Sequence, residues 1–125
     1  MTENELSYKI RGAIFNVYNE VGPGLLESAY EAALLYELLE LELSVRKQVP
    51  LPFYYKKVKL DTGYRIDLLV EDKIIIEVKS VEQVLGVHHK QLLTYLKLTD
   101  KKLGLLVNFN VMNINKGITR LVNGL

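Results

Sequence analysis

Two acidic residues and a lysine interrupt two apolar runs of the sequence. Asp67 lies in the first run, residues 64–70, and Glu77 and Lys79 lie in the second, residues 74–79. The short polar segment between the runs predicts a β-hairpin. If three residues form its turn, Asp67 lies directly opposite Glu77, and Lys79 lies on the same face of the hairpin.

This arrangement favours a metal site. Directly opposed carboxylates destabilise a sheet unless a cation lies between them. Two carboxylates and an adjacent backbone carbonyl suit Mg²⁺ or Mn²⁺, and such an ion keeps several waters for a phosphate and a nucleophile. Lys79 can reach the attacking water or the scissile phosphate. The residues therefore point to hydrolysis of phosphodiester bonds.

A structural role would explain the same residues differently. Glu77 and Lys79 could face solvent on an exposed strand, with Asp67 paired to Arg65 or Lys79. However, Ile74-Ile75-Ile76 and Val78 predict a buried central strand, where a charge needs a reason. We therefore favour the metal site. The apolar residues that alternate onto the opposite face of the hairpin are Ile66, Leu68, Val70, Ile74, Ile76 and Val78.

The helices and strands predicted before and after the hairpin in the sequence must position Asp67, Glu77 and Lys79. Thr2 and Glu5 resemble a capping box that starts a helix over residues 4–20. Pro50 and Pro52 confine their segment to an edge strand or a strand entry. The order α-α-β-β-β-α-β-β predicts an α/β fold with a central mixed β-sheet flanked by helices. The other predicted elements are helices at 25–43 and 88–99 and strands at 53–60, 103–109 and 118–122.

The composition fits one small domain, residues 1–125. The 16 basic and 15 acidic residues give a net charge of +1, so any binding of nucleic acid must come from a local patch. Because the chain has no cysteine, disulfides and thiolate metal sites are excluded. The acidic N-terminus lacks the pattern of a secretion signal, and no apolar run approaches the length that spans a bilayer. We expect a soluble, cytoplasmic protein without a membrane segment.

Two motifs carry a family resemblance that covers nearly the whole chain. Asp67 followed by Glu77-Val78-Lys79 resembles the PD-(D/E)xK nuclease superfamily, with its restriction-endonuclease-like core of helix, three-stranded meander, helix and strand. Residues 24–30, Gly-Leu-Leu-Glu-Ser-Ala-Tyr, match the motif that names the GxxExxY protein family, a branch of that superfamily. Ile66 stands where the proline of the superfamily's name would be.

The resemblance implies a role for each motif residue. Asp67 and Glu77 would be metal ligands together with the backbone carbonyl of Val78, and Lys79 would be the catalytic lysine. Glu27 would be an acidic residue on a helix that reaches the metal directly or through water. Gln91, with Tyr95 one turn later, would be the polar helix position that follows the lysine in many members.

Several of these residues also have a plain structural interpretation. Glu27 could be a first-turn acid that the helix dipole favours, and Tyr30, on the same helix face, could either pack in the core or touch substrate. Gln91 and Tyr95 could merely cap the sheet. Adjacent histidines, His88 and His89, point in different directions at a helix start, so only one could face the site.

Lysines follow three aromatic residues in the predicted strand at 53–60. Lys56 and Lys57 could follow a phosphate backbone while Tyr54 and Tyr55 stack on bases. Alternatively, the lysines keep a solvated edge strand from aggregating.

These observations lead to three functional hypotheses. The first is a metal-dependent nuclease that hydrolyses DNA and uses Mg²⁺ or Mn²⁺. The second is a catalytically silent module that binds nucleic acid or protein on the same fold, and the third is a structural or toxin-antitoxin-like interaction protein. A homodimer would let so small a domain grip a duplex better.

Overall fold

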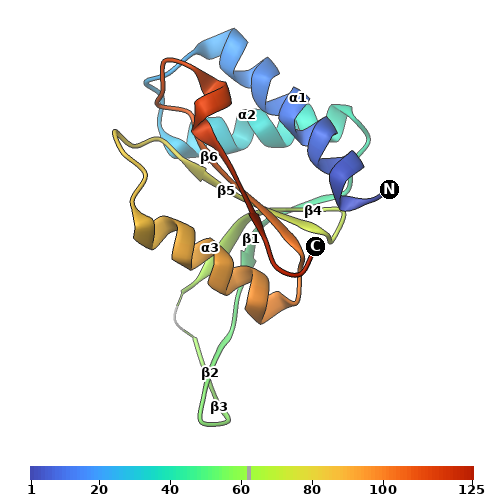
Figure 1. Ribbon diagram of the computed structural model, residues 1–125, viewed down its shortest axis with the longest axis vertical. Helices are drawn as coiled ribbons and strands as arrows, with labels where there is room; N and C mark the ends of the chain where they lie inside the picture. The colour runs from blue at the N-terminus through green and yellow to red at the C-terminus, as the bar shows by residue number, and fades with distance from the viewer. Residues whose placement is uncertain (62) are drawn as a thin grey trace.

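A five-stranded sheet lies between two helical layers in the computed structural model, which describes residues 1–61 and 63–125. Helices α1 and α2 cover one face of the sheet, and α3 covers the other (Figure 1). This confirms the predicted α/β class and the helix-flanked mixed sheet. The elements are α1 (Glu3–Val21), α2 (Glu27–Glu40), β1 (Val45–Pro50), β2 (Phe53–Tyr55), β3 (Val58–Leu60), β4 (Arg65–Val70), β5 (Ile74–Lys79), α3 (Gly86–Thr99), β6 (Leu103–Asn108), a 3₁₀ turn (Ile114–Gly117) and β7 (Ile118–Val122).

The strand order β1-β4-β5-β6-β7 puts β5 at the centre of the sheet. Strands β5 and β6 run parallel and are joined through α3, while the other neighbours are antiparallel. The β4–β5 register, with Val70 opposite Ile74 and Leu68 opposite Ile76, is the one predicted for a three-residue turn. As predicted, the segment that reaches Pro50 is an edge strand.

Each face of the sheet buries its own apolar cluster. Leu68 and Ile76 pack with α1 and α2, and Leu69 and Ile75 pack with α3. The prediction that Ile66 shares a face with Leu68 is wrong, because Ile66 packs with the cluster under α3. Strict alternation therefore fails at Asp67, which lies between these two residues.

Helix ends follow local signals at the start of the chain. Thr2 accepts a hydrogen bond from the Glu5 backbone N–H at 3.1 Å and donates its own N–H to the Glu5 carboxylate at 3.0 Å, which confirms the capping box. Helix α2 is shorter than predicted: it starts at Glu27, because Leu26 has an extended backbone, and it ends at Glu40. Among the helices of the described residues, none is both long and apolar enough to cross a bilayer.

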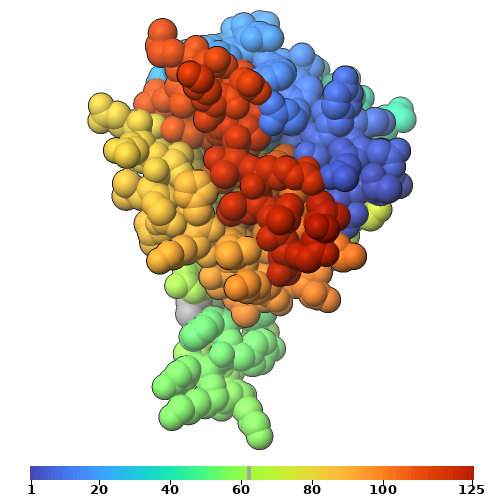
Figure 2. Space-filling view, in the orientation of Figure 1, coloured from blue at the N-terminus to red at the C-terminus, as the bar shows by residue number. Residues whose placement is uncertain are grey.

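Residues 53–60 do not form the single strand that was predicted. They form a hairpin, β2–β3, hereafter the arm, which projects from the body of the molecule (Figures 1 and 2). Lys56 and Lys57 form its tip with φ angles of 50° and 71°. This left-handed conformation lets two residues reverse the chain, so the lysines predicted to lie along a strand lie on a turn instead.

Close packing fixes α3 on the sheet. A Cβ atom at Gly104 of β6 would lie 2.9 Å from Cδ1 of Leu92, so glycine lets this helix approach the strand closely.

Candidate active site

Two carboxylates replace part of the backbone ladder where β4 and β5 separate. The Asp67 carboxylate accepts a hydrogen bond from the Val78 backbone N–H at 2.8 Å, and the Glu77 carboxylate accepts one from the Asp67 backbone N–H at 2.8 Å. Backbone pairing of the two strands stops one residue earlier, at Leu68 and Ile76. The two acids therefore lie together, as predicted, but as reciprocal side-chain caps of the opposite strand rather than as a ladder pair.

Helix α2 and strand β1 bring further polar groups to these acids. The amide of Gln48 donates to Glu31 at 2.8 Å and, more weakly, to Asp67 at 3.4 Å. Glu27 accepts a hydrogen bond from the Ser80 backbone N–H at 3.2 Å, which ties the start of α2 to the end of β5. A cavity of about 200 Å³ lies among these groups, lined by Glu27, Ser28, Glu31, Gln48, Asp67 and Val78.

Burial and neighbouring acids raise the pKa of three carboxyl groups at this site. Burial, followed by the charge of Asp67, raises the pKa of Glu77 from 4.5 to about 8, and this side chain is only 5% exposed. Burial also raises the pKa of Asp67 and, with the neighbouring Asp67 charge, that of Glu31. Lys79 lowers the pKa of both Asp67 and Glu77, so its ammonium lies within electrostatic reach of each. One lysine offsets only part of the repulsion.

The donor set fits a small divalent cation. Mg²⁺ is commonly held by one or two carboxylates and keeps several waters, and Asp67 and Glu77 provide two carboxylates on adjacent strands. Each uses one oxygen to accept a backbone N–H, which orients the second oxygen. In the part of the chain that is described, no group of three or more His, Cys, Asp or Glu side chains is close enough to hold a metal ion. The carboxylates alone thus provide an incomplete shell that water or substrate must complete.

Comparison with known proteins places this geometry in a family. The model of the PD-(D/E)XK nuclease superfamily matches residues 4–121. The chain belongs to this superfamily. No curated protein and no solved structure gave a significant match. The three helices and the mixed five-stranded sheet agree with the superfamily's restriction-endonuclease-like fold.

Two of the residues that carry the resemblance lie at the end of β5 and the start of α2. Lys79 ends β5, two residues after Glu77, and is half-buried. Its backbone carbonyl accepts a hydrogen bond from Phe109, which fixes the strand end. Glu27 starts α2 beside the same strand end and contributes to the electrostatics of Asp67 by raising its pKa.

The two polar positions Gln91 and Tyr95 lie on α3, across the sheet from α2. Gln91 donates a hydrogen bond to the hydroxyl of Tyr95 at 3.0 Å. Burial, followed by the charge of Glu77, raises the pKa of Tyr95 to about 12, so this hydroxyl lies near the acidic pair. His88 has a structural role, since its Nδ1 accepts a hydrogen bond from the Leu85 backbone N–H and caps α3.

The suggestion that Tyr30 contacts substrate is wrong. Its side chain is 0% exposed and stacks on Phe109 with ring centroids 4.4 Å apart. The hydroxyl donates to the Gly22 carbonyl at 2.5 Å and accepts from the Leu25 N–H at 3.1 Å. Tyr30 therefore fixes the loop before α2 and so positions Glu27. Lys56 and Lys57 lie at the tip of the arm and take no part in the acidic cluster.

Sequence reasoning gave no catalytic role to Glu31 and missed Gln48. Glu31 follows Glu27 by one helical turn, a spacing that places both on one face of α2 and could have identified it. Gln48 gave no such signal. It lies opposite Asp67 on the edge strand with a φ angle of 50°, and nothing in the local sequence requires that conformation.

Proposed function

We propose that this chain is a nuclease that hydrolyses DNA phosphodiester bonds with the help of Mg²⁺ or Mn²⁺. One observation carries the proposal: Asp67 and Glu77 approach each other at the parting of β4 and β5, with Lys79 in electrostatic reach. The charge of Asp67 raises the pKa of the buried Glu77, and a cation that binds both carboxylates would favour their ionised forms. Membership of a nuclease superfamily agrees with this arrangement.

Each residue has a defined role in this proposal. Asp67 and Glu77 hold the cation, with the carbonyl of Val78 and, directly or through water, Glu27. A bound divalent cation lowers the pKa of water and offsets the charge that develops on the phosphoryl group. Lys79 places its ammonium beside the attacked phosphate. Gln91, next to Tyr95, orients a water or a phosphate oxygen by hydrogen bonding.

Residues 24–30 support placing the chain in the GxxExxY branch of the superfamily. Gly24 adopts a φ angle of 103°, a conformation that disfavours any side chain. Glu27 faces the end of β5, and Tyr30 anchors the preceding loop. The glycine, the acid and the tyrosine of the motif thus have separate physical reasons for their positions.

The direct test is cleavage of supercoiled plasmid and of a labelled single-stranded DNA with Mn²⁺ by the wild type, Asp67→Asn and Lys79→Ala. We expect cleavage by the wild type and loss of at least about a hundredfold in either variant, the scale seen when a transition-state contact is removed. Lys9→Ala, an exposed lysine on α1, is the matched control and should cleave normally. Equal cleavage by Lys79→Ala would identify a contaminating nuclease.

A catalytically silent module that binds nucleic acid is the second candidate. The observation that favours it is the lack of a three-ligand metal cluster in the described residues. It predicts salt-dependent binding of DNA, no cleavage with any divalent cation, and no rise of the melting temperature when Mn²⁺ replaces chelator. The nuclease hypothesis predicts the opposite result for the last two measurements.

A further inference from the structure

The arm concentrates positive charge on a nearly neutral molecule. Residues 53–60 carry three basic residues, Lys56, Lys57 and Lys59, and no acid. This gives the segment a net charge of +3, whereas the whole chain carries only +1. The local patch that binding of a polyanion requires is therefore present, and it lies on the part of the molecule that projects furthest from the body (Figure 2).

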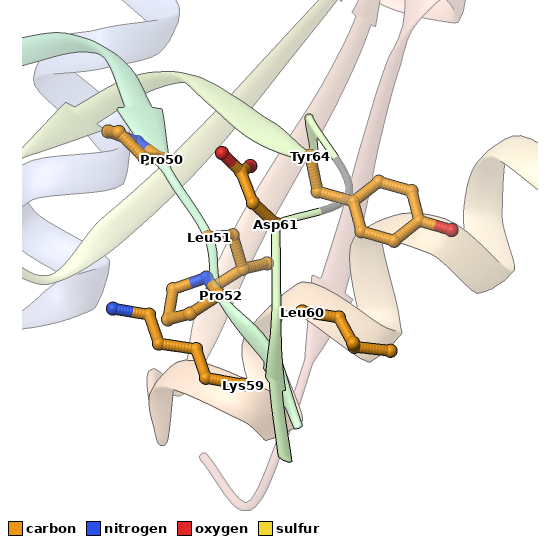
Figure 3. Close-up of a pocket in the computed structure, with 7 residues that line it drawn as sticks. All are labelled: Pro50, Leu51, Pro52, Lys59, Leu60, Asp61 and Tyr64. Carbon is orange, nitrogen blue, oxygen red and sulfur yellow. The ribbon is translucent and has the colours of Figure 1, made fainter. Parts of the chain in front are cut away.

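The two faces of the arm differ in chemistry. Phe53 pairs with Leu60 and Tyr55 pairs with Val58, so these four apolar side chains share one face. Tyr55 and Val58 are 56% and 58% exposed. Lys59 belongs to the other face, and Figure 3 shows it pointing away from Leu60 and from the ring of Tyr64. The arm thus has one aromatic and aliphatic face, with Lys56 and Lys57 at its tip and Lys59 on the opposite face.

The apolar face of the arm continues into a groove on the body. A cavity of about 410 Å³ lies between Phe53 and Tyr64 on one side and α3 on the other, where Gln91 and Tyr95 line it. The Tyr64 and Tyr95 rings meet edge to face with centroids 6.2 Å apart. Lys90 of α3 also lines this cavity. Aromatic rings, an amide and a cation therefore surround one space.

The groove and the acidic pair lie at the same end of the sheet. Strand β1 ends and β4 begins at the base of the arm, where Pro50 pairs with Arg65. Because β5 runs antiparallel to β4, its end at Lys79 lies at the same end of the sheet. Asp67 is only two residues beyond Arg65, and Tyr95 lines the groove while lying near Glu77.

We propose that the apolar face of the arm and the groove beside α3 bind an unpaired DNA strand and direct it to the acidic pair. This inference rests on the proposed nuclease function and specifies its substrate. Aromatic side chains beside lysines are typical of surfaces that stack unpaired bases and follow the backbone phosphates. Bases in a duplex do not offer their faces for stacking. Base edges in a duplex groove are read mainly by bidentate Arg, Lys, Asn or Gln side chains. Residues 53–60 contain no Arg, Asn or Gln, and their lysines stand beside exposed tyrosines instead.

The test compares binding of labelled single-stranded DNA with binding of a blunt duplex of the same sequence, by fluorescence anisotropy in chelator. We expect the wild type to prefer the single strand and Tyr55→Ala to bind it at least about fivefold more weakly, because one lost stacking contact has an effect of this size. Replacing Lys56 and Lys57 by alanine should lower the slope of log K against log salt by about 1.4. Tyr8→Ala and Lys9→Ala, exposed positions on α1, are the controls and should bind as the wild type does.

Three results would overturn the inference. They are equal or tighter binding of the duplex, unchanged binding by Tyr55→Ala, and a dimer in sedimentation that Tyr55→Ala dissociates, since a second copy would then cover the apolar face. Chelator prevents hydrolysis, so this test is independent of the cleavage assay. If the protein binds the single strand through Tyr55 but never cleaves DNA, only the nuclease proposal is refuted. If it cleaves DNA but Tyr55→Ala binds the single strand as the wild type does, only the proposed binding groove is refuted.

Discussion

The substitution Glu77→Gln should stabilise the metal-free protein at alkaline pH. Glutamine keeps the size of the side chain, and its carbonyl oxygen can still accept the Asp67 backbone N–H that Glu77 accepts at 2.8 Å. It removes only the charge. Because Glu77 is buried beside Asp67, that charge is unfavourable once the carboxyl ionises in the folded state.

The magnitude follows from the pKa of Glu77, which rises from 4.5 to about 8 on folding. Between these values the folded protein keeps a proton that the unfolded chain has lost, so the stability of the wild type falls as the pH rises through this window. Each pKa unit corresponds to about 1.4 kcal/mol, which gives a loss of about 3 to 5 kcal/mol above about pH 8. The variant lacks this loss, because its side chain does not titrate.

Urea denaturation from about pH 5 to about pH 9 measures the difference. The chain has no tryptophan, so far-UV circular dichroism is the suitable signal. In chelator, we expect the two proteins to be nearly equal at the acidic end and the variant to be more stable at the alkaline end. In Mn²⁺ at about a hundred times its Kd the wild type should gain about 2.7 kcal/mol. The variant, with one ligand charge fewer, should gain less.

Glu40→Gln, an exposed acid at the end of α2, is the control for charge removal and should follow the wild type at every pH. If the stability difference between Glu77→Gln and the wild type stays constant across the pH range, then Glu77 titrates normally in the folded protein. The electrostatic reasoning behind the cation site would then be wrong.

Two further predictions concern how the fold supports the site. Tyr30→Phe should lower the free energy of unfolding by about 1 to 3 kcal/mol in urea denaturation, since both hydrogen bonds of a buried hydroxyl are lost. Gly117→Ala should cost about 1 to 3 kcal/mol in the same assay, because the new Cβ would lie 2.3 Å from the Asn108 carbonyl oxygen. Its control, Gly12→Ala, meets nothing within 4 Å in the middle of α1 and should instead add about 0.5 to 1 kcal/mol.

Strong local patterns made the central hairpin predictable. A polar turn between two apolar runs fixed the β4–β5 register, and that register brought Asp67 and Glu77 together. The capping box at Thr2 identified the start of α1 for the same reason, since each signal acts within a few residues. Tertiary contacts did not need to be known in either case.

The arm could not be predicted because its turn lacks the usual residues. Lys56 and Lys57 both adopt the left-handed conformation, which Asn and Gly favour and which costs other residues about 1 kcal/mol or more each. A run of aromatic residues and lysines without a turn signal looks like one continuous strand. Two extended segments that pair only with each other form an isolated ribbon, which is marginally stable by itself, and the sequence gives no sign of where such a ribbon folds back.

Gln48 explains why the geometry of the acids escaped prediction. Strand alternation assumes a regular ladder, yet Gln48 has a φ angle of 50° opposite Asp67, and Ile66 leaves the face that alternation assigns to it. The same irregularity allows the Gln48 amide to donate toward both Glu31 and Asp67. A neutral donor placed between two acids can donate hydrogen bonds to their oxygens but does not offset their negative charge. Since a divalent cation can both bind the oxygens and offset their charge, we propose that the break in regularity that defeats the sequence pattern also prepares these acids to bind one.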